Sequence, residues 1–174
     1  MSYDFSKAFN CISHHILLNK LNDLAFPLGF VQWMYSYLQD RFQRVKYKGV
    51  FSERRPITSG VPQGSLLGPY LFVIYCHDLR PAHEDTFMLQ YADDICQVIN
   101  VKNKSTTNYT DKIEAECTNL RHWTAANKLT LNESKFFSMV FSKKSCLCDF
   151  NLPFTEVTKY KLSILGVTWT SNLS

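Results

Sequence analysis

The chain has 174 residues, of which 45% are hydrophobic and 14% aromatic. This is enough to build one domain with a packed core, and it excludes an intrinsically disordered protein. The formal net charge of +4 permits contact with nucleic acid without requiring it. The sequence shows no secretion signal and no apolar run of membrane-spanning length, and its six cysteines form no CxxC pair. We therefore expect an intracellular protein, nuclear or cytoplasmic and not secreted, with reduced thiols and no membrane partner.

The N-terminal part is predicted to contain a strand, two helices and a β-hairpin. Leu17, Leu21 and Leu24 share one helix face, and Pro27 and Gly29 are expected to end that helix. The second helix carries four side chains that we expect in the core: Phe30, Met34, Tyr37 and Leu38. The predicted ranges are residues 1–5 for the strand, 16–24 and 30–42 for the helices, and 42–56 for the hairpin around Gly49.

The remainder is predicted to alternate helices and strands. Ser65 is expected to cap a helix after the turn at residues 62–64, and Asn127 is expected to cap the C-terminus of another, whose side chains Ile113, Cys117 and Leu120 are in phase. The predicted ranges are helices at residues 65–78 and 111–127, a hairpin at 87–100, and strands at 135–141 and 160–169. This order favours an α+β fold, an antiparallel sheet with helices packed on one face.

Two adjacent carboxylates, Asp93 and Asp94, follow Tyr91-Ala92 inside the hairpin predicted at residues 87–100. Neighbouring like charges repel, and a buried charge without a partner is very unfavourable. A divalent cation removes both problems, and hard oxygen ligands at a hairpin tip suit Mg²⁺. The alternative is an exposed Asp-Asp turn, which is common in arbitrary sequences.

Four other segments accompany the aspartate pair in a fixed order: Tyr3-Asp4-Phe5, Pro62-Gln63-Gly64, Leu129–Lys135 and Leu165-Gly166. Together these segments resemble the reverse transcriptase palm of non-LTR (LINE-type) retrotransposons, over nearly the whole chain. The resemblance implies that residues 1–174 are a partial reverse transcriptase domain, reaching from the first aspartate motif to the primer-positioning hairpin. It also implies that the fingers and thumb are missing, so we expect a fragment or decayed copy with little activity alone.

The resemblance implies a two-metal site for nucleotidyl transfer to a primer 3′-hydroxyl. Asp4, Asp93 and Asp94 would be the metal ligands, and the backbone carbonyl of Phe5 would complete the nucleotide-side ion. The cofactors would be two Mg²⁺ ions, with Mn²⁺ as a possible substitute. Three unrelated surface acids are the alternative.

Residues on both sides of the aspartates are implied to bind the nucleotide. Phe9 would lie under the incoming sugar and exclude a 2′-hydroxyl, which favours deoxynucleotides; its alternative is core packing. The loop of Pro62, Gln63 and Gly64 would contact the templating base pair and the nucleotide, and it would also be an ordinary helix-entry loop.

Lys135 matches the lysine proposed in polymerases to protonate the leaving pyrophosphate, although a solvated lysine is the alternative. Tyr91 would lie against the primer end, and Leu165 and Gly166 would position the primer terminus. The predicted hairpin carries six basic residues between Arg41 and Arg55 against one acid, Glu53. Three of them are candidates for primer or template contact: Arg44, Lys46 and Lys48. An ordinary exposed edge hairpin is the alternative.

The first functional hypothesis is an RNA-directed DNA polymerase fragment, whose partners are an RNA template, a DNA primer and deoxynucleoside triphosphates. The second is a catalytically inactive retrotransposon relic that acts at most as a nucleic-acid-binding module through the basic hairpin. The carboxylates favour the first hypothesis, because a pure binder gains nothing from acids that face phosphates. The sequence leaves the oligomeric state open.

Overall fold

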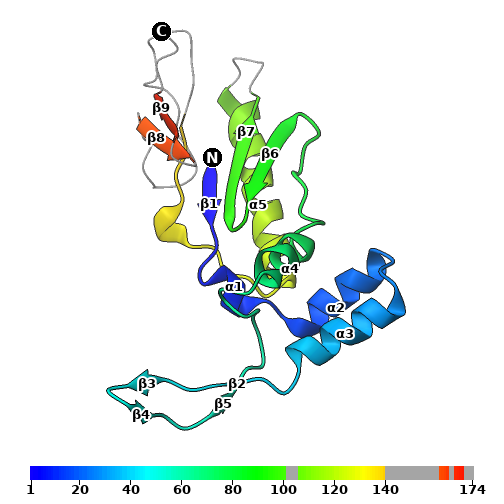
Figure 1. Cartoon of the computed structure of the whole chain (residues 1–174). Helices are drawn as coiled ribbons and strands as arrows, with labels where there is room; N and C mark the ends of the chain where they lie inside the picture. Colours follow the sequence, from blue (N-terminus) through cyan, green and yellow to red (C-terminus); the bar gives the residue numbers. More distant parts are fainter. Residues whose placement is uncertain (101–105, 140–160, 165–166, 171–174) are drawn as a thin grey trace. The chain divides into compact units, whose positions relative to one another are not determined.

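The computed structural model describes residues 1–100, 106–139, 161–164 and 167–170 (Figure 1). The chain divides into two compact units. The sheet unit contains Met1–Ser6, Arg80–Trp123 and Leu131–Ser174, and the helical unit contains Lys7–Leu79 and Thr124–Thr130. The N-terminal strand therefore belongs with segments that follow it by more than 70 residues.

The sheet unit is built on three antiparallel strands in the order β1-β7-β6. The strands are β1 (Ser2–Asp4), β6 (Thr86–Tyr91) and β7 (Asp94–Ile99). β6 and β7 form the predicted hairpin, and β1 pairs with the outer edge of β7. The central strand is thus the one that begins at Asp94, and both of its neighbours run antiparallel to it.

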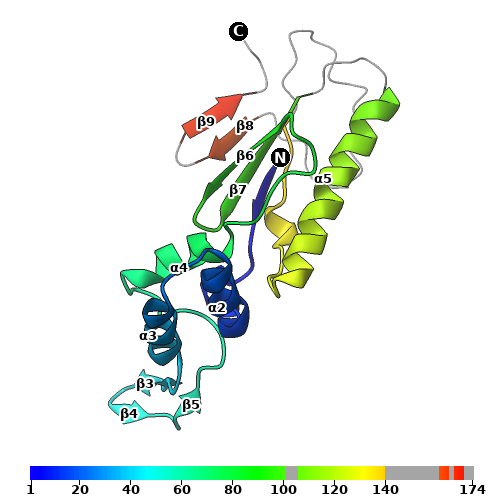
Figure 2. The same ribbon diagram turned by 90° about the vertical axis from the view of Figure 1, so that its right-hand side faces the viewer.

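One long helix, α5 (Thr106–Ala126), lies along the sheet (Figure 2). Its side chains Ile113 and Cys117 are buried and pack with Met1, Ile99 and Phe136. Leu120 is also buried, so the predicted apolar phase of this helix is confirmed. The helix begins earlier than the predicted residue 111.

The segment after α5 differs from the prediction of a strand at residues 135–141. Lys135 ends a 3-10 turn, η1 (Glu133–Lys135), and its backbone N–H bonds to the carbonyl of Asn132 at 3.0 Å. Phe137 then pairs with Ser2 through a single bridge. Residues 140 and 141 lie outside the described residues.

The described part contains two strands where one final strand was predicted at residues 160–169, and their pairing agrees with the hairpin that the resemblance implies there. They are β8 (Lys161–Ile164) and β9 (Val167–Thr170), which pair antiparallel as a hairpin. Leu165 and Gly166, which connect them, lie outside the described residues.

The helical unit has four helices: α1 (Ala8–Cys11), α2 (His14–Asp23), α3 (Leu28–Leu38) and α4 (Leu67–Tyr75). Its core includes eight side chains with almost no exposed surface: Ile12, Leu17, Leu21, Met34, Leu38, Leu71, Phe72 and Tyr75. Leu24, predicted on the same face as Leu17, follows the end of α2 and is 41% exposed. On α3, Val31 is buried in place of the predicted Phe30.

The ends of the helices correct three expectations. α2 ends with Ala25 at a φ of 56°, and the N–H of Phe26 bonds to the carbonyl of Leu21 at 3.1 Å. This is a Schellman motif, which reverses the chain without a glycine. Gly29 does not end α2, because it lies inside α3. α3 starts after Pro27 and ends at Leu38, four residues before the predicted end.

The C-terminus of α5 ends in the same Schellman motif. Lys128 has a φ of 52°, and the N–H of Leu129 bonds to the carbonyl of Thr124 at 2.9 Å. Asn127, the predicted cap, directly follows the last residue of α5 and is buried, and the left-handed residue is the next one, Lys128. The expectation that Ser65 caps α4 is confirmed, since its hydroxyl accepts the N–H of Gly68 at 3.0 Å. The same helix ends at Tyr75, before the predicted residue 78.

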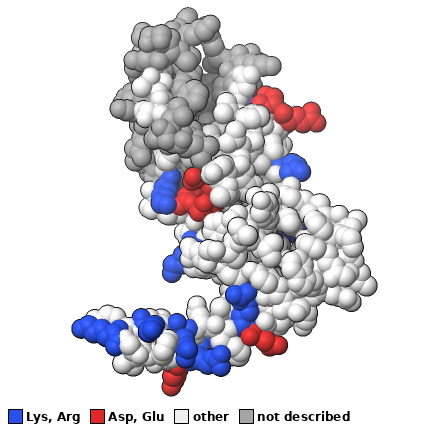
Figure 3. All heavy atoms as spheres, viewed as in Figure 1, with Lys and Arg blue, Asp and Glu red and all other residues white. Residues whose placement is uncertain are grey.

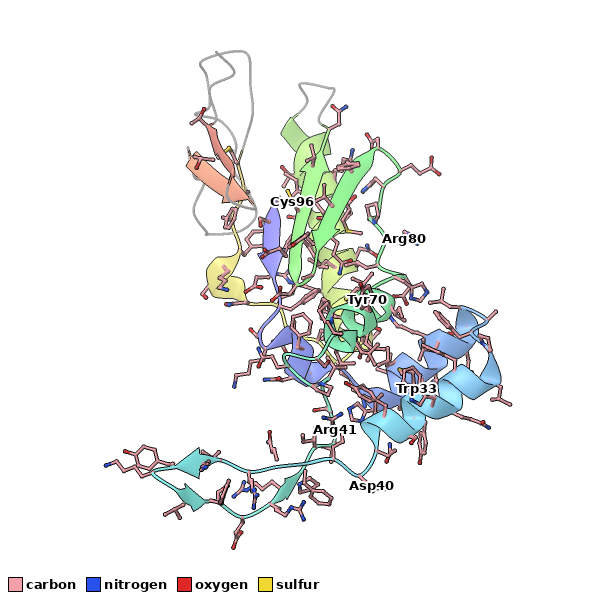
Figure 4. All side chains as sticks on the ribbon, viewed as in Figure 1. Trp33, Asp40, Arg41, Tyr70, Arg80 and Cys96 are labelled. Atoms are coloured by element: carbon pink, nitrogen blue, oxygen red, sulfur yellow. The ribbon has the colours of Figure 1, made fainter. Side chains whose placement is uncertain are left out.

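The predicted hairpin at residues 42–56 is confirmed as two short antiparallel ladders. β3 (Lys46–Tyr47) pairs with β4 (Val50–Phe51) at the tip, and β2 (Phe42–Gln43) pairs with β5 (Arg55–Pro56) at the base. Lys48 and Gly49 both have positive φ, at 47° and 84°, as a two-residue type I′ turn requires. We call residues 41–56 the basic arm; in Figure 4 its first residue, Arg41, lies where α3 leads into β2.

The fold is mixed α and β with antiparallel sheets, which confirms the coarse prediction. Among the helices in the described part of the chain, none is long and apolar enough to cross a membrane.

Candidate active site

Asp4 and Asp94 lie directly opposite each other on β1 and β7. Directly opposed residues of an antiparallel pair point to the same face of the sheet, with Cβ atoms about 5 Å apart. Tyr91 on β6 is opposite Asp94 in turn, so Asp4, Asp94 and Tyr91 form one row across the three strands. The 89 residues between the first two carboxylates are thus bridged by strand pairing, as the sequence predicts.

Asp93 sits in the two-residue turn between β6 and β7. The residue before it, Ala92, has a φ of 50°, and its carbonyl accepts the side-chain N–H of Gln90 at 3.1 Å. Only the first of the two turn residues has positive φ, which is the pattern of a type II′ turn and normally favours glycine. The turn places the two aspartates side by side at the tip of the hairpin.

Lys135 reaches this row from the other side of β1. Its Nζ lies 2.8 Å from Oδ2 of Asp4, and the N–H of Asn132 bonds to the Asp4 carbonyl at 2.8 Å. Phe5 pairs with Leu131 through a bridge, so the chain before Lys135 lies alongside β1. Three predicted site residues from distant parts of the sequence therefore meet here: Asp4, Asp94 and Lys135.

The electrostatics of the site follow from this crowding. Burial raises the pKa of Asp94, and the charges of Asp93 and Asp4 raise it further, whereas Lys135 opposes them. The hydrogen bond to Asp4 and the charge of that carboxylate raise the pKa of Lys135, which keeps its amino group charged. The site therefore has excess negative charge that already attracts one cation.

These residues fit a divalent cation in chemistry, because carboxylate oxygens are the ligands that Mg²⁺ prefers. In the described part of the chain, no three His, Cys, Asp or Glu side chains are arranged as a ready metal-binding group. Asp4 is instead neutralised by the Lys135 amino group, which stands where a cation is attracted.

Sequence reasoning missed a buried polar network beneath this row. Glu116 on α5 is fully buried and accepts the backbone N–H groups of Ala82 and His83 at 2.9 and 3.0 Å. Gln97 on β7 donates to Glu116 at 3.3 Å and accepts the hydroxyl of Tyr3 at 3.0 Å. The network thus ties the strand of Asp4 and the strand of Asp94 to the same helix.

A sequence signal for Glu116 exists. It lies three residues after Ile113 and four before Leu120, so it falls on the apolar stripe of α5. An acid on such a stripe needs buried partners, and here it has them. Burial acts to raise the pKa of Glu116, but the hydrogen bonds to its carboxylate, the one from Ala82 foremost, together outweigh burial and lower the pKa.

The predicted nucleotide-binding residues lie in the helical unit. The N–H of Val61 bonds to the Phe9 carbonyl at 2.9 Å, so the loop before Pro62 is joined to α1. Phe9 is half-buried, and its ring packs 5.0 Å from that of Phe72, which is the core contact named as its alternative. Gln63 is exposed.

Two glycines shape this loop for different reasons. A Cβ on Gly60 would lie 2.8 Å from the Asn10 backbone, so no side chain fits there. A Cβ on Gly64 would meet nothing within 4 Å, and its φ of 84° accounts for the glycine. The surface beside Gly64 is therefore open to a ligand.

The predicted contacts to primer or template are exposed where they are described. Arg44, Lys46 and Lys48 lie on the basic arm, and Tyr91 is 63% exposed on the sheet. Leu165 and Gly166 lie outside the described residues.

Comparison with known proteins places this geometry in a family. Residues 1–169 match the family model described as reverse transcriptase (RNA-dependent DNA polymerase). The chain is 30% identical over 153 residues to the RNA-directed DNA polymerase from mobile element jockey of Drosophila melanogaster, covering 83% of this chain and 16% of that protein. It is 29% identical over 146 residues to the protein of the same name from Drosophila funebris, covering 80% and 16%. The chain thus spans about a sixth of the length of these relatives. Because the family model covers nearly all of it, the chain belongs to the reverse transcriptase family, in the non-LTR (LINE-type) retrotransposon group.

Proposed function

We propose that this chain is the palm portion of an RNA-directed DNA polymerase, spanning residues 1–174 as a partial reverse transcriptase domain. The observation that carries the proposal is the pairing of Asp4 with Asp94 in one row, with the Lys135 amino group 2.8 Å from Asp4. Carboxylates from separate strands that converge on one point are what a nucleotidyl-transfer site needs.

Asp4, Asp93 and Asp94, with the Phe5 carbonyl, would hold the two Mg²⁺ ions, and Mn²⁺ would substitute. When bound, such ions favour ionisation of the primer 3′-hydroxyl and stabilise the charge of the leaving pyrophosphate. Burial first, and then repulsion from Asp93 and Asp4, raises the pKa of Asp94, and a bound cation relieves that repulsion.

The remaining residues would bind and orient the substrates. Phe9 would limit the space at the sugar, while Gln63 and the open surface at Gly64 would contact the nucleotide and its template base. Lys135 would donate a proton to the pyrophosphate, a role consistent with the raised pKa that keeps it protonated.

An RNA template, a DNA primer and deoxynucleoside triphosphates would be the partners. Tyr91 lies in the same row as the carboxylates, which is a suitable place for the primer end. Leu165 and Gly166 would position the primer terminus, and Arg44, Lys46 and Lys48 would contact phosphates.

The second candidate function is a retrotransposon relic that binds nucleic acid without catalysis. The basic arm favours it, because all its residues from Phe42 to Pro56 are exposed and six of its side chains are basic.

The test measures Mn²⁺ binding by electron paramagnetic resonance and Mg²⁺-dependent primer extension on an RNA template, for the 174-residue chain and Asp94→Asn. We expect Asp94→Asn to weaken Mn²⁺ binding about tenfold or more and to abolish any extension, because one metal ligand is lost. The matched control is Asp85→Asn, an exposed acid of the sheet unit that pairs with Lys112.

Equal Mn²⁺ binding in the chain and in Asp94→Asn would overturn the assignment of the site. Oligonucleotide binding without Mn²⁺ binding or extension would support the relic instead.

A further inference from the structure

The basic arm holds more positive charge than the whole chain. Its six basic residues and one acid give a net charge of +5, whereas the full chain carries +4, so the remainder sums to −1. Figure 3 shows the Lys and Arg atoms gathered over β2–β5. The partner of this arm is therefore anionic.

One face of the arm interleaves these charges with aromatic rings. Arg44 lies 3.9 Å and Lys46 5.3 Å from the centre of the Phe51 ring, and Lys46 is directly opposite Phe51 in the ladder. At the base, Arg54 lies 5.6 Å from the Phe42 ring. We call these five residues the aromatic–basic face: Phe42, Arg44, Lys46, Phe51 and Arg54.

The other face of the tip is different in character. Tyr47 is directly opposite Val50, and both side chains are more than 70% exposed. Lys48 lies 5.4 Å from the Tyr47 ring. Since alternate residues of a strand point to opposite faces, Tyr47 offers a ring that is more exposed than Phe42 and Phe51 but does not belong to the aromatic–basic face.

The rings of the arm stay exposed to solvent when the arm folds. Every residue from Phe42 to Pro56 is exposed, with Phe42 at 54% and Phe51 at 47%. A two-stranded ribbon without a core is marginally stable in water. A ligand that covers the rings and neutralises the cations would stabilise it.

Single-stranded nucleic acid has both chemical features that this face requires. Its bases stack on aromatic rings and guanidinium planes, and its phosphates pair with Arg and Lys. A duplex fits less well, because its base faces are hidden in the stack. An anionic membrane fits less well too, since a ribbon lying on lipid places rings and cations on opposite faces.

We propose that the aromatic–basic face is a binding site for single-stranded nucleic acid, with bases stacked on Phe42 and Phe51 and phosphates held by Arg44, Lys46 and Arg54. This site needs neither the carboxylates nor a divalent ion. It rests on the phosphate contacts proposed above for Arg44 and Lys46, but it can fail while the proposed metal site holds.

The test is fluorescence anisotropy of the full chain with a labelled 20-mer of oligouridylate, in EDTA so that no divalent ion contributes. The comparison ligands are a 20-base-pair duplex and an abasic 20-mer of the same backbone. We expect the single strand to bind at least about fivefold tighter than the abasic strand, because stacking contributes about 1–3 kcal/mol per base. We also expect a log–log salt slope of about −2, as three phosphate contacts on a single strand predict.

The decisive variant is Phe42→Leu/Phe51→Leu, which keeps apolar bulk and all charges. It should lose the preference for the strand with bases while binding the abasic strand unchanged. The matched control is Tyr47→Leu, which removes a ring from the opposite face and should bind like the parent. Circular dichroism confirms that each variant keeps its fold.

Three results would overturn the proposal. One is equal affinity for the normal and abasic strands, and another is an equal loss in Tyr47→Leu. The third is tight binding to phosphatidylserine vesicles with no binding to the oligonucleotide.

Discussion

The ion pair of Lys135 with Asp4 shows that one of the proposed metal ligands is already neutralised by a cation of the chain itself. The Lys135 amino group lies 2.8 Å from Asp4, so any divalent ion that binds there competes with a built-in cation. Lys135→Ala should therefore bind Mn²⁺ severalfold more tightly, since a positive charge next to the site is removed. The same variant should extend a primer less well, if Lys135 is the proton donor to the pyrophosphate.

Isothermal titration with Mn²⁺ and single-turnover primer extension separate these two effects. Lys128→Ala, an exposed lysine of the helical unit, is the control and should change neither. Weaker Mn²⁺ binding in Lys135→Ala would contradict the competition argument.

Glu116 is the residue on which the arrangement of the carboxylate strands depends. Its side chain is fully buried and accepts two backbone N–H groups, and hydrogen bonds to a charged group contribute about 1.5–3 kcal/mol. Glu116→Gln should lower the free energy of unfolding by about 2 kcal/mol in urea denaturation. Glu114→Gln, an exposed neighbour on the same helix, should leave it unchanged.

Glu116 also predicts a pH dependence. Burial acts to raise its pKa, but the hydrogen bonds to its carboxylate together outweigh burial and hold the pKa below the ordinary 4.5. An acid with a depressed folded pKa contributes stability that is complete above pH 4.5 and is lost as the pH falls through the folded value. Urea melts between pH 3 and 6 should therefore show a smaller acid loss in Glu116→Gln than in the parent; parallel curves would contradict this.

At the scale of the element, two helix ends put ordinary residues where glycine is normally found. Ala25 is exposed with a φ of 56°, so Ala25→Gly should stabilise the chain by up to about 1 kcal/mol through relief of backbone strain. Gly29 is the reverse case: it lies inside α3, and a Cβ there meets nothing within 4 Å. Gly29→Ala should also stabilise the chain, by up to about 1 kcal/mol.

Thermal melting of the two single variants and the double variant checks this pair. The effects should add, because each acts on the backbone entropy or strain of its own helix. A destabilised Ala25→Gly would show that the left-handed residue carries no strain.

The same helix ends show what sequence reasoning can and cannot predict. Apolar periodicity identified α5 through Ile113, Cys117 and Leu120, because that signal is local. The pairing of Asp4 with Asp94 is long-range, and it was expected from the family resemblance of the aspartate motifs. Gly29 was misread as a helix terminator, since glycine ends a helix only where φ is positive and sequence does not show φ. Lys135 was expected in a strand, but the contact with Asp4 is long-range and favours a 3-10 turn instead.

At the scale of the whole molecule, the two compact units have cores of their own, while the basic arm has none. Segments without buried contacts open locally at little cost. Limited trypsin digestion should therefore cut first in the arm, after Arg44, Lys46, Lys48 or Arg54. Mass spectrometry of the first fragments identifies the site, and a first cut at the buried Lys20 would contradict the prediction.

The contact at Gly60 has a consequence for engineering. The N–H of Gly60 bonds to the Ile12 carbonyl at 2.7 Å, the N–H of Val61 bonds to the Phe9 carbonyl, and a Cβ on Gly60 would collide with the Asn10 backbone. The backbone around Phe9, the proposed sugar-selecting residue, is therefore tightly packed against the start of the proposed nucleotide loop, so neither segment can shift without the other. A library that varies Phe9 to change substrate choice has to vary the loop after Gly60 in the same clones, because the best residue at one position depends on the residue at the other.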